Sequence, residues 1–263
     1  YPHHLINILD PAEAYSAARF RDEVTPLLAD ITSRGRIPLL VGGTMLYFKA
    51  LAGGLAQMPS ADAEVRARIA AMAQSGGWES VHAELARVDP VAAERIRPND
   101  PQRIQRAYEV FLLTGITLSQ MHAGQAAEKG GGDRSNTAVL PYTMHYMAVA
   151  PQDRSVLHER IAERFVLMMK QGLIPEVESL RNRGDLNSSM PSIRAVGYRQ
   201  VWDFLDGKLD EAEMVERGII ATRQLAKRQF TWLRGWHAEI DWLDSLDPKR
   251  FELALKALKE AAI

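Results

Sequence analysis

A threonine behind a pair of glycines, Gly42, Gly43 and Thr44, is the first group of residues whose spacing could support chemistry. The apolar run Ile37–Val41 precedes this group and predicts a strand buried on both faces, as in a parallel sheet. A predicted helix follows, with apolar residues at helical spacing: Met45, Leu46, Phe48 and Leu51. Open α/β sheets bind ligands beyond the carboxyl end of a strand, where glycines let the backbone come close and helix N–H groups are unpaired. The threonine could therefore hydrogen-bond a substrate, or it could only cap the helix.

A long helix predicted over residues 210–235 carries the second group. From Arg217 to Trp236 five residues are basic and none is acidic, although the whole chain has a net charge of only −1. At about 100° per residue, Arg223, Lys227 and Arg234 fall within roughly 40° of one another. The opposite side, which we expect to face the core, carries Met214, Ala221, Leu225 and Trp232. An acid-free basic face is typical of binding to backbone phosphates, and a solvated or distantly paired face is the alternative.

Two smaller clusters add to this helix. The stretch Pro191–Trp202 contains Arg194 and Arg199 and no acid, and its Gly197-Tyr198 pair could offer close backbone approach and a stacking ring. The first turns of another predicted helix carry side chains that can pair with base edges: Gln102, Arg103, Gln105 and Arg106. Three acid-poor basic clusters together favour an anionic polymer over a single small ligand as the partner.

Composition excludes several other kinds of site. The absence of cysteine rules out disulfides, thiolate metal sites and a cysteine nucleophile, and it fits a reducing, cytoplasmic location. The seven histidines do not have metal-binding spacing, and the 263 residues contain no complete phosphate-binding loop. No apolar run approaches the roughly 20 residues of a membrane span, so we expect no membrane association.

The elements that must position these groups follow an α/β order with a helical interruption. A helix over residues 16–34 leads into the strand Ile37–Val41, and further strands are predicted over Tyr142–Ala150 and Ile240–Leu243. Residues 59–123 carry consecutive helix signals and no convincing strand, and the Gly-rich residues 124–138 predict a loop. We therefore expect part of an α/β core over 1–57, an all-helical insertion over 58–140, and over 141–263 a return to the core with the basic helices.

Read in order, several motifs resemble bacterial tRNA dimethylallyltransferases (isopentenyltransferases), over nearly the whole chain. They are DPAEAYSAARFR, LLVGGTMLYFKAL, PSADAEVRARI, RIRPNDPQRIQRAYEVF, PSIRAVGYRQVW and TRQLAKRQFTWLRGW. The resemblance implies an α/β fold with a P-loop-NTPase-like parallel sheet and a helical insertion. It also implies transfer of a dimethylallyl group from dimethylallyl diphosphate to N6 of the adenosine 3′ of the anticodon in tRNA, assisted by Mg2+, by a monomer.

The resemblance also assigns roles to residues. Thr44 would hydrogen-bond the reacting amine, Arg160 would lie near the diphosphate leaving group, and Gly42, Gly43 and Arg223 would contact substrate. The tRNA-binding residues would be Arg66, Gln102, Arg103, Ile104, Gln105, Arg106, Arg194, Ala195, Val196, Gly197, Tyr198, Arg199, Lys227, Arg228, Gln229, Phe230, Thr231, Trp232, Leu233 and Arg234. No protein ligand for the metal is assigned.

One departure from the family limits the expected activity. The family's GPTASGKT-type phosphate loop and its general-base aspartate precede the position where this sequence starts, so we expect the chain alone to bind tRNA weakly and to transfer no prenyl group. Two other functions stay open. An adenylate isopentenyltransferase would act on free nucleotide and would have little use for the basic helix. A noncatalytic RNA-binding module would use the sheet only as a scaffold.

Overall fold

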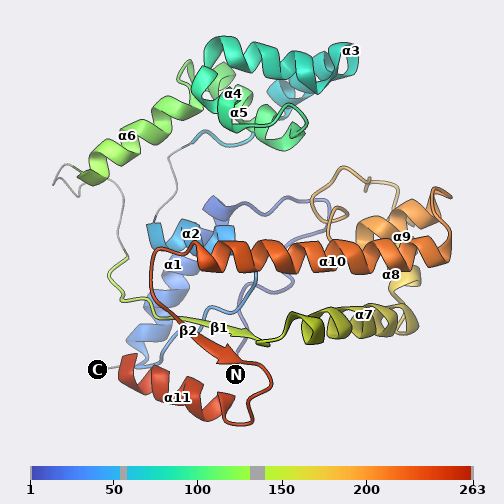
Figure 1. The fold of residues 1–263 in the computed structure, drawn as a ribbon. Coiled ribbons are helices and arrows are strands. Elements are labelled where there is room, and N and C mark those ends of the chain that lie inside the picture. Colours follow the sequence, from blue (N-terminus) through green and yellow to red (C-terminus); the bar gives the residue numbers. More distant parts are fainter. Residues whose placement is uncertain (1, 54–57, 131–139, 262–263) are drawn as a thin grey trace. The chain divides into compact units, whose positions relative to one another are not determined.

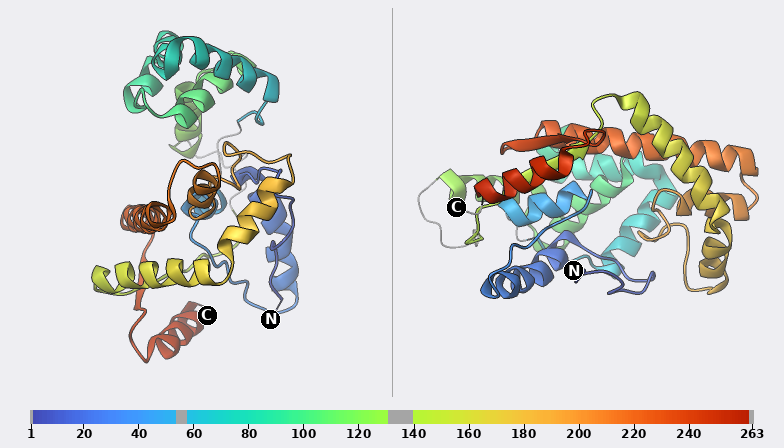
Figure 2. Two further views of the ribbon diagram at one scale, coloured as in Figure 1. Left: turned by 90° about the vertical axis from the view of Figure 1, so that its right-hand side faces the viewer. Right: turned by 90° about the horizontal axis from the view of Figure 1, so that it is seen from below.

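The computed structural model describes residues 2–53, 58–130 and 140–261, and the chain divides into two units. Unit 1 comprises Tyr1–Ala50 and Pro141–Ile263, and unit 2 comprises Leu51–Leu140. Figures 1 and 2 show the ribbon from three sides. No helix in the described part of the chain is both long and apolar enough to cross a membrane.

Unit 2 is helical throughout the part that the structure describes. Its helices are α3 (Ala63–Val88), α4 (Pro90–Arg95), α5 (Pro101–Thr114) and α6 (Leu118–Gly130). They enclose a core that includes Ile69, Leu85 and Ile104, all with no exposed surface. Helix α3 bends at Gly77, whose φ of +76° suits glycine. The helical character predicted for residues 59–123 is therefore confirmed.

The predicted loop over residues 124–138 is wrong in its first half. The backbone stays helical to Gly130 at the end of α6, and residues 131–138 lie outside the described part of the chain. The run GQAAEKG contains Gln, Glu, Lys and two alanines, which are strong helix formers, so helix propensity outweighed the isolated glycine.

The sheet of unit 1 has two parallel strands, β1 (Tyr146–Ala150) and β2 (Ile240–Asp244), which pair in register from Tyr146 opposite Ile240 to Ala150 opposite Asp244. Both strands were predicted from the sequence, the first with an N-terminal end four residues too early. Helix α7 (Arg154–Lys170) follows β1, and α11 (Arg250–Ala261) follows β2 and lies beside it (Figures 1 and 2).

The predicted buried strand Ile37–Val41 does not form in the described structure. These residues pair with no other strand among those described, and the side chains of Ile37, Leu39 and Val41 are 57%, 63% and 92% exposed. A β-strand forms only where its backbone can hydrogen-bond to a neighbouring strand. In the described structure β1 and β2 pair only with each other. The predicted helix after the glycines does form, as α2 (Met45–Gly53).

The remaining helices of unit 1 are α1 (Ala17–Ser33), α8 (Leu173–Asn182), α9 (Tyr198–Leu205) and α10 (Glu211–Arg234). Helices α8 and α9 and the start of α10 surround a second core. The core includes Val177, Ile193, Val201 and Met214, which are fully buried. It fixes the first part of α10 against α8 and α9 and thereby sets the direction of the basic helix.

Candidate active site and nucleic-acid interface

The first half of helix α10 is anchored in the second core and against α7. Asp210 and Glu213 form a capping box at its start, with the Glu213 N–H donating to Asp210 Oδ1 at 2.8 Å. Met214 is fully buried, and a methyl group added at Gly218 would lie 2.1 Å from Phe165 Cζ of α7. The phenyl ring therefore fills the notch that this glycine leaves, which locks α7 and α10 together.

The second half of α10 is more open than the sequence predicted. Leu225 and Trp232 were expected to face the core with Met214 and Ala221, yet they are 38% and 39% exposed. Met214 and Val215 are the α10 residues that belong to the core around α8 and α9, so that core does not extend to Leu225 and Trp232. Hydrophobic spacing identified the helix correctly, but it could not show where the core ends.

The basic face of α10 is exposed and free of carboxylate partners at its centre. Lys227 and Arg228 make no ion pair within the described residues, and Arg234 lies 5.9 Å from the centre of the Phe230 ring. Arg217, nearer the start, lies 3.9 Å from a Glu213 oxygen.

Other residues of α10 make contacts within the protein. Arg223 turns toward α7, where its Nη2 donates to the His158 carbonyl at 3.4 Å. Thr231 donates to the Lys227 carbonyl, and Leu233 is half-buried.

An aromatic and cationic cluster lies at the end of α10 and contains two residues that sequence reasoning missed. The ring of Phe230 is parallel to that of Trp242 on β2, with centroids 6.2 Å apart. Arg154, in the first turn of α7, lies 5.8 Å from the centre of the same Phe230 ring. Arg154 follows the predicted strand directly, so the rule that ligands bind at strand carboxyl ends could have identified it.

The Gly42–Thr44 turn lies beside this second half of α10. All three residues are exposed, including Thr44. The side-chain amide of Gln229 donates to the Gly43 carbonyl at 3.0 Å. Helix α10 therefore connects the turn to the basic face, because Gln229 directly follows Lys227 and Arg228.

Arg160 lies at the carboxyl edge of the sheet, as the ligand-binding rule for α/β folds requires. Its Nη1 donates to Ser245 Oγ at 3.3 Å. Ser245 follows β2 directly, and its N–H donates to the carbonyl of Ala150, the last residue of β1. The guanidinium is exposed and makes no ion pair with any described carboxylate.

The segment before α9 divides into exposed cations and structural residues. Arg194, Ala195 and Arg199 are exposed, whereas Val196 is half-buried and Gly197 is buried with a φ of +98°. The Tyr198 hydroxyl donates to the Glu176 carboxylate. Burial and this hydrogen bond raise the pKa of Tyr198 to about 12. The ring that the sequence offered for stacking is therefore half-buried and tied to α8.

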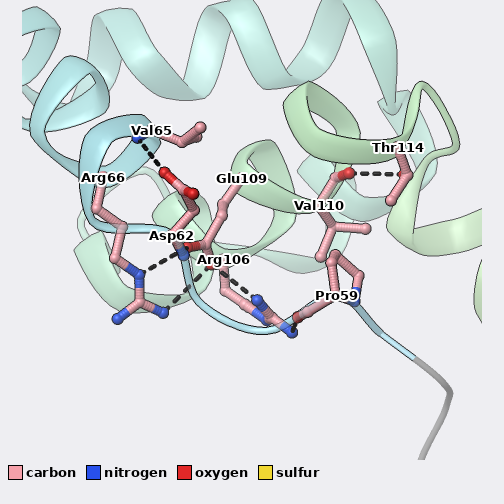
Figure 3. Close-up of polar contacts among 8 residues, drawn as sticks. All are labelled: Pro59, Asp62, Val65, Arg66, Arg106, Glu109, Val110 and Thr114. Atoms are coloured by element: carbon pink, nitrogen blue, oxygen red, sulfur yellow. Dashed lines mark hydrogen bonds and ion pairs between the residues drawn. The ribbon is translucent and has the colours of Figure 1, made fainter.

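In unit 2 the predicted RNA-binding arginines surround a buried carboxylate (Figure 3). Glu109 has no exposed surface, and it accepts from Arg66 Nε at 2.7 Å, from Arg106 Nη1 at 2.8 Å and from the Asp62 N–H at 3.0 Å. Arg106 also donates to the Pro59 carbonyl at 2.8 Å. Burial raises the pKa of Glu109, but the hydrogen bonds outweigh burial, so its pKa is lowered overall.

The other predicted residues of α5 have mixed positions. Gln102 and Arg103 are exposed, with Arg103 3.5 Å from Asp100, and Gln105 is half-buried. Ile104 is fully buried in the core of unit 2, so its side chain packs there and is not exposed to tRNA in this structure. A helix that shows glutamine and arginine to solvent must bury the residue on the opposite side.

No metal-binding cluster forms in the described part of the molecule. Nowhere within residues 2–53, 58–130 and 140–261 do three His, Asp or Glu side chains gather in a way that could hold a cation.

Comparison with known proteins identifies relatives of this chain. A family model described as IPP transferase matches residues 1–236. The full-length tRNA isopentenylpyrophosphate transferase from Bacillus halodurans is 34% identical, with a TM-score of 0.63 over 99% of this chain and 80% of that chain. The tRNA delta(2)-isopentenylpyrophosphate transferase from Staphylococcus epidermidis is 26% identical, with a TM-score of 0.59 over 98% of this chain and 81% of that chain.

A eukaryotic dimethylallyltransferase acting on tRNA shares the fold. It is 23% identical, with a TM-score of 0.69 over 98% of this chain, which spans 64% of that protein. The match over residues 1–236 and the 34% identity across almost the whole sequence confirm the resemblance found in the motifs. This chain belongs to the IPP transferase family.

Proposed function

We propose that this chain provides the tRNA-binding surface and the amine-binding turn of a tRNA dimethylallyltransferase. The single observation that carries the proposal is that α10 bears exposed cations without carboxylate partners and also reaches the glycine turn next to Thr44. Backbone phosphates of an anticodon arm would bind Lys227, Arg228 and Arg234. The family relationship supports dimethylallyl diphosphate as the second substrate and a cytoplasmic location.

The proposed reaction transfers a dimethylallyl group to N6 of the adenosine 3′ of the anticodon. The bond from the allylic carbon to the diphosphate oxygen breaks, a bond from that carbon to N6 forms, and N6 loses a proton to a base, a role that the family resemblance gives to an aspartate. The adenine must leave the base stack to reach the electrophile. The exposed Thr44 hydroxyl would accept a hydrogen bond from the amine and orient it, and the Arg160 guanidinium would stabilise charge on the departing diphosphate.

The finer features of the family are part of the same proposal. We propose that unit 1 belongs to a P-loop-type α/β core and that unit 2 is its helical insertion. Magnesium, which the family resemblance implies, would neutralise charge on the diphosphate. The 263 residues contain no GPTASGKT-type loop, and we expect the chain by itself to bind tRNA without transferring prenyl groups.

Two measurements test this function. In equilibrium titrations the chain should bind tRNA with a steep salt dependence, and excess AMP should not compete. Competition by AMP with no salt dependence would instead favour an adenylate isopentenyltransferase. Prenyl transfer by the chain alone would contradict the expected inactivity.

The role of Thr44 is tested by turnover. With a segment joined ahead of Tyr1 that supplies both the family's phosphate loop and its general-base aspartate, Thr44→Ala should slow transfer by roughly 100-fold, because the amine loses its orienting partner. Binding of tRNA should stay unchanged. Restored transfer that Thr44→Ala does not slow would remove the threonine from the mechanism, and no transfer at all would favour a noncatalytic RNA-binding module.

A further inference from the structure

Gln229 lies inside the basic segment of α10, but its side chain points to the Gly42–Thr44 turn. A side chain that binds an RNA phosphate would instead point to solvent. The Gln229 side-chain amide donates to the Gly43 carbonyl at 3.0 Å, across 186 residues of sequence. A side chain whose N–H group is occupied in this way cannot offer the same N–H to RNA. Its neighbours Lys227 and Arg228 have exposed side chains without such a partner in the described structure.

The contact requires glycine at position 43 in particular. A Cβ atom built on Gly43 would lie 2.2 Å from Gln229 Nε2, closer than real Cβ atoms come to any neighbour. A Cβ atom on Gly42 would meet only the far edge of the Phe48 ring, at 4.0 Å. Neither glycine has a positive φ, so the two differ only in this close approach. The second glycine of the pair therefore serves the contact with α10.

A second contact joins the same two segments. Lys49 Nζ of α2 lies 5.5 Å from the centre of the Trp232 ring, a cation–π distance. Trp232 is three residues after Gln229 and thus lies on the same side of α10. The glycine turn and the helix after it are fixed to the basic helix at two points along one side.

We propose that Gln229 is a positioning residue that holds the Gly42–Thr44 turn, and with it the Thr44 hydroxyl, at a fixed place on the RNA-binding helix. The held carbonyl belongs to the peptide bond between Gly43 and Thr44, so this hydrogen bond restrains the backbone that carries the hydroxyl. The inference rests on the proposed function of Thr44. It assigns Gln229 to positioning the amine-binding group, and leaves contact with RNA to the cations beside it.

The direct test uses Gln229→Met, which keeps the size and neutrality of the side chain and removes the donor. Amide hydrogen exchange in peptides spanning residues 41–48 should become about 5- to 10-fold faster. The Kd for tRNA should stay within about 2-fold. With the segment that supplies the phosphate loop and the general-base aspartate joined ahead of Tyr1, kcat should fall while KM for tRNA is unchanged.

The glycine pair offers a matched control. Gly43→Ala should accelerate exchange in the same peptides, since the new methyl group displaces the Gln229 amide, whereas Gly42→Ala should not. Arg228→Ala should give the opposite pattern, a several-fold weaker Kd with unchanged exchange.

Two outcomes would overturn the inference. One is a Gln229→Met variant that loses as much tRNA affinity as Arg228→Ala and shows unchanged exchange, because Gln229 would then be an RNA contact. The other is equal exchange in the Gly42→Ala and Gly43→Ala variants. If the unmodified chain bound no tRNA at all, the proposed function would fail, and the exchange measurements would still decide whether Gln229 holds the turn.

Discussion

Two groups of basic residues that looked alike in the sequence have different surroundings in the fold. In unit 2, Arg66 and Arg106 converge on the fully buried carboxylate of Glu109. In unit 1, Lys227 and Arg228 of α10 make no ion pair within the described residues. An arginine whose guanidinium group already bonds a carboxylate within the protein has fewer donors left for RNA.

The difference follows from the cost of burying charge. A carboxylate removed from water is tolerated only with charged or hydrogen-bonding partners. Glu109 obtains these from both arginines and from the Asp62 N–H, and Arg106 in addition holds the Pro59 carbonyl. The unit 2 arginines therefore fix the start of α3 against α5 (Figure 3). The cations of α10 face solvent and keep their donors available.

The largest expected effect comes from removing the buried carboxylate. Glu109→Ala should lower the free energy of unfolding of unit 2 by about 3 kcal/mol, because two guanidinium groups and one backbone N–H lose their acceptor. Urea unfolding followed by hydrogen exchange in α3 and α5 would measure the loss. Glu94→Ala, at an exposed glutamate of α4, is the control and should change stability by less than about 0.5 kcal/mol. A loss below about 1 kcal/mol for Glu109→Ala would mean that both groups of arginines are equally free.

Removing two cations from α10 should affect binding and leave stability unchanged. The double variant Lys227→Ala/Arg228→Ala should weaken tRNA binding by roughly 10- to 100-fold at low salt and reduce the salt slope by about two. Titrations at several salt concentrations would measure both. Lys256→Ala/Lys259→Ala on α11 carries the same charge change and should leave the affinity within about 3-fold. Equal losses in the two double variants would indicate a response to net charge without a localised surface.

The smallest expected effect is a loss of stability of unit 2 at acidic pH. Because the pKa of Glu109 is lowered in the folded state, its stabilisation is present above the unfolded value of about 4.3 and is lost as the pH falls through the folded value. Burial raises the pKa of Asp89, but hydrogen bonds from Ser119 and Ala92 lower it overall, so Asp89 acts in the same direction. Unit 2 should thus be less stable at pH 3 than at pH 6, and Glu109→Gln should flatten this dependence. An unchanged profile in unfolding at several pH values would contradict the ionised state of Glu109.

Helix starts depend on local contacts. Ser16, Asp62, Asp100 and Asp210 each accept a hydrogen bond from an N–H three residues later, at 2.8 to 3.2 Å. These contacts span one helical turn, so the sequence contains both partners within four residues. For the same reason the sequence revealed the acid-free charge of α10, and its motifs carried the family resemblance.

The candidate site depended more on contacts between distant residues. Neither the pairing of Arg66 with Glu109, 43 residues away, nor the contact of Gln229 with Gly43 follows a local pattern. The same holds for Trp242 and Arg154, which reach Phe230 from β2 and α7.

The sequence by itself determined most of the helical segments, the capping residues that begin several helices, and which helix carries the unbalanced positive charge. Only the tertiary structure decided that Ile37–Val41 stays unpaired, that Trp232 is exposed, and which arginines are tied to a carboxylate. The physical reason is that caps and periodicity act within a turn or two of one helix. Strand pairing, burial and charge neutralisation depend on partners that only the fold brings together.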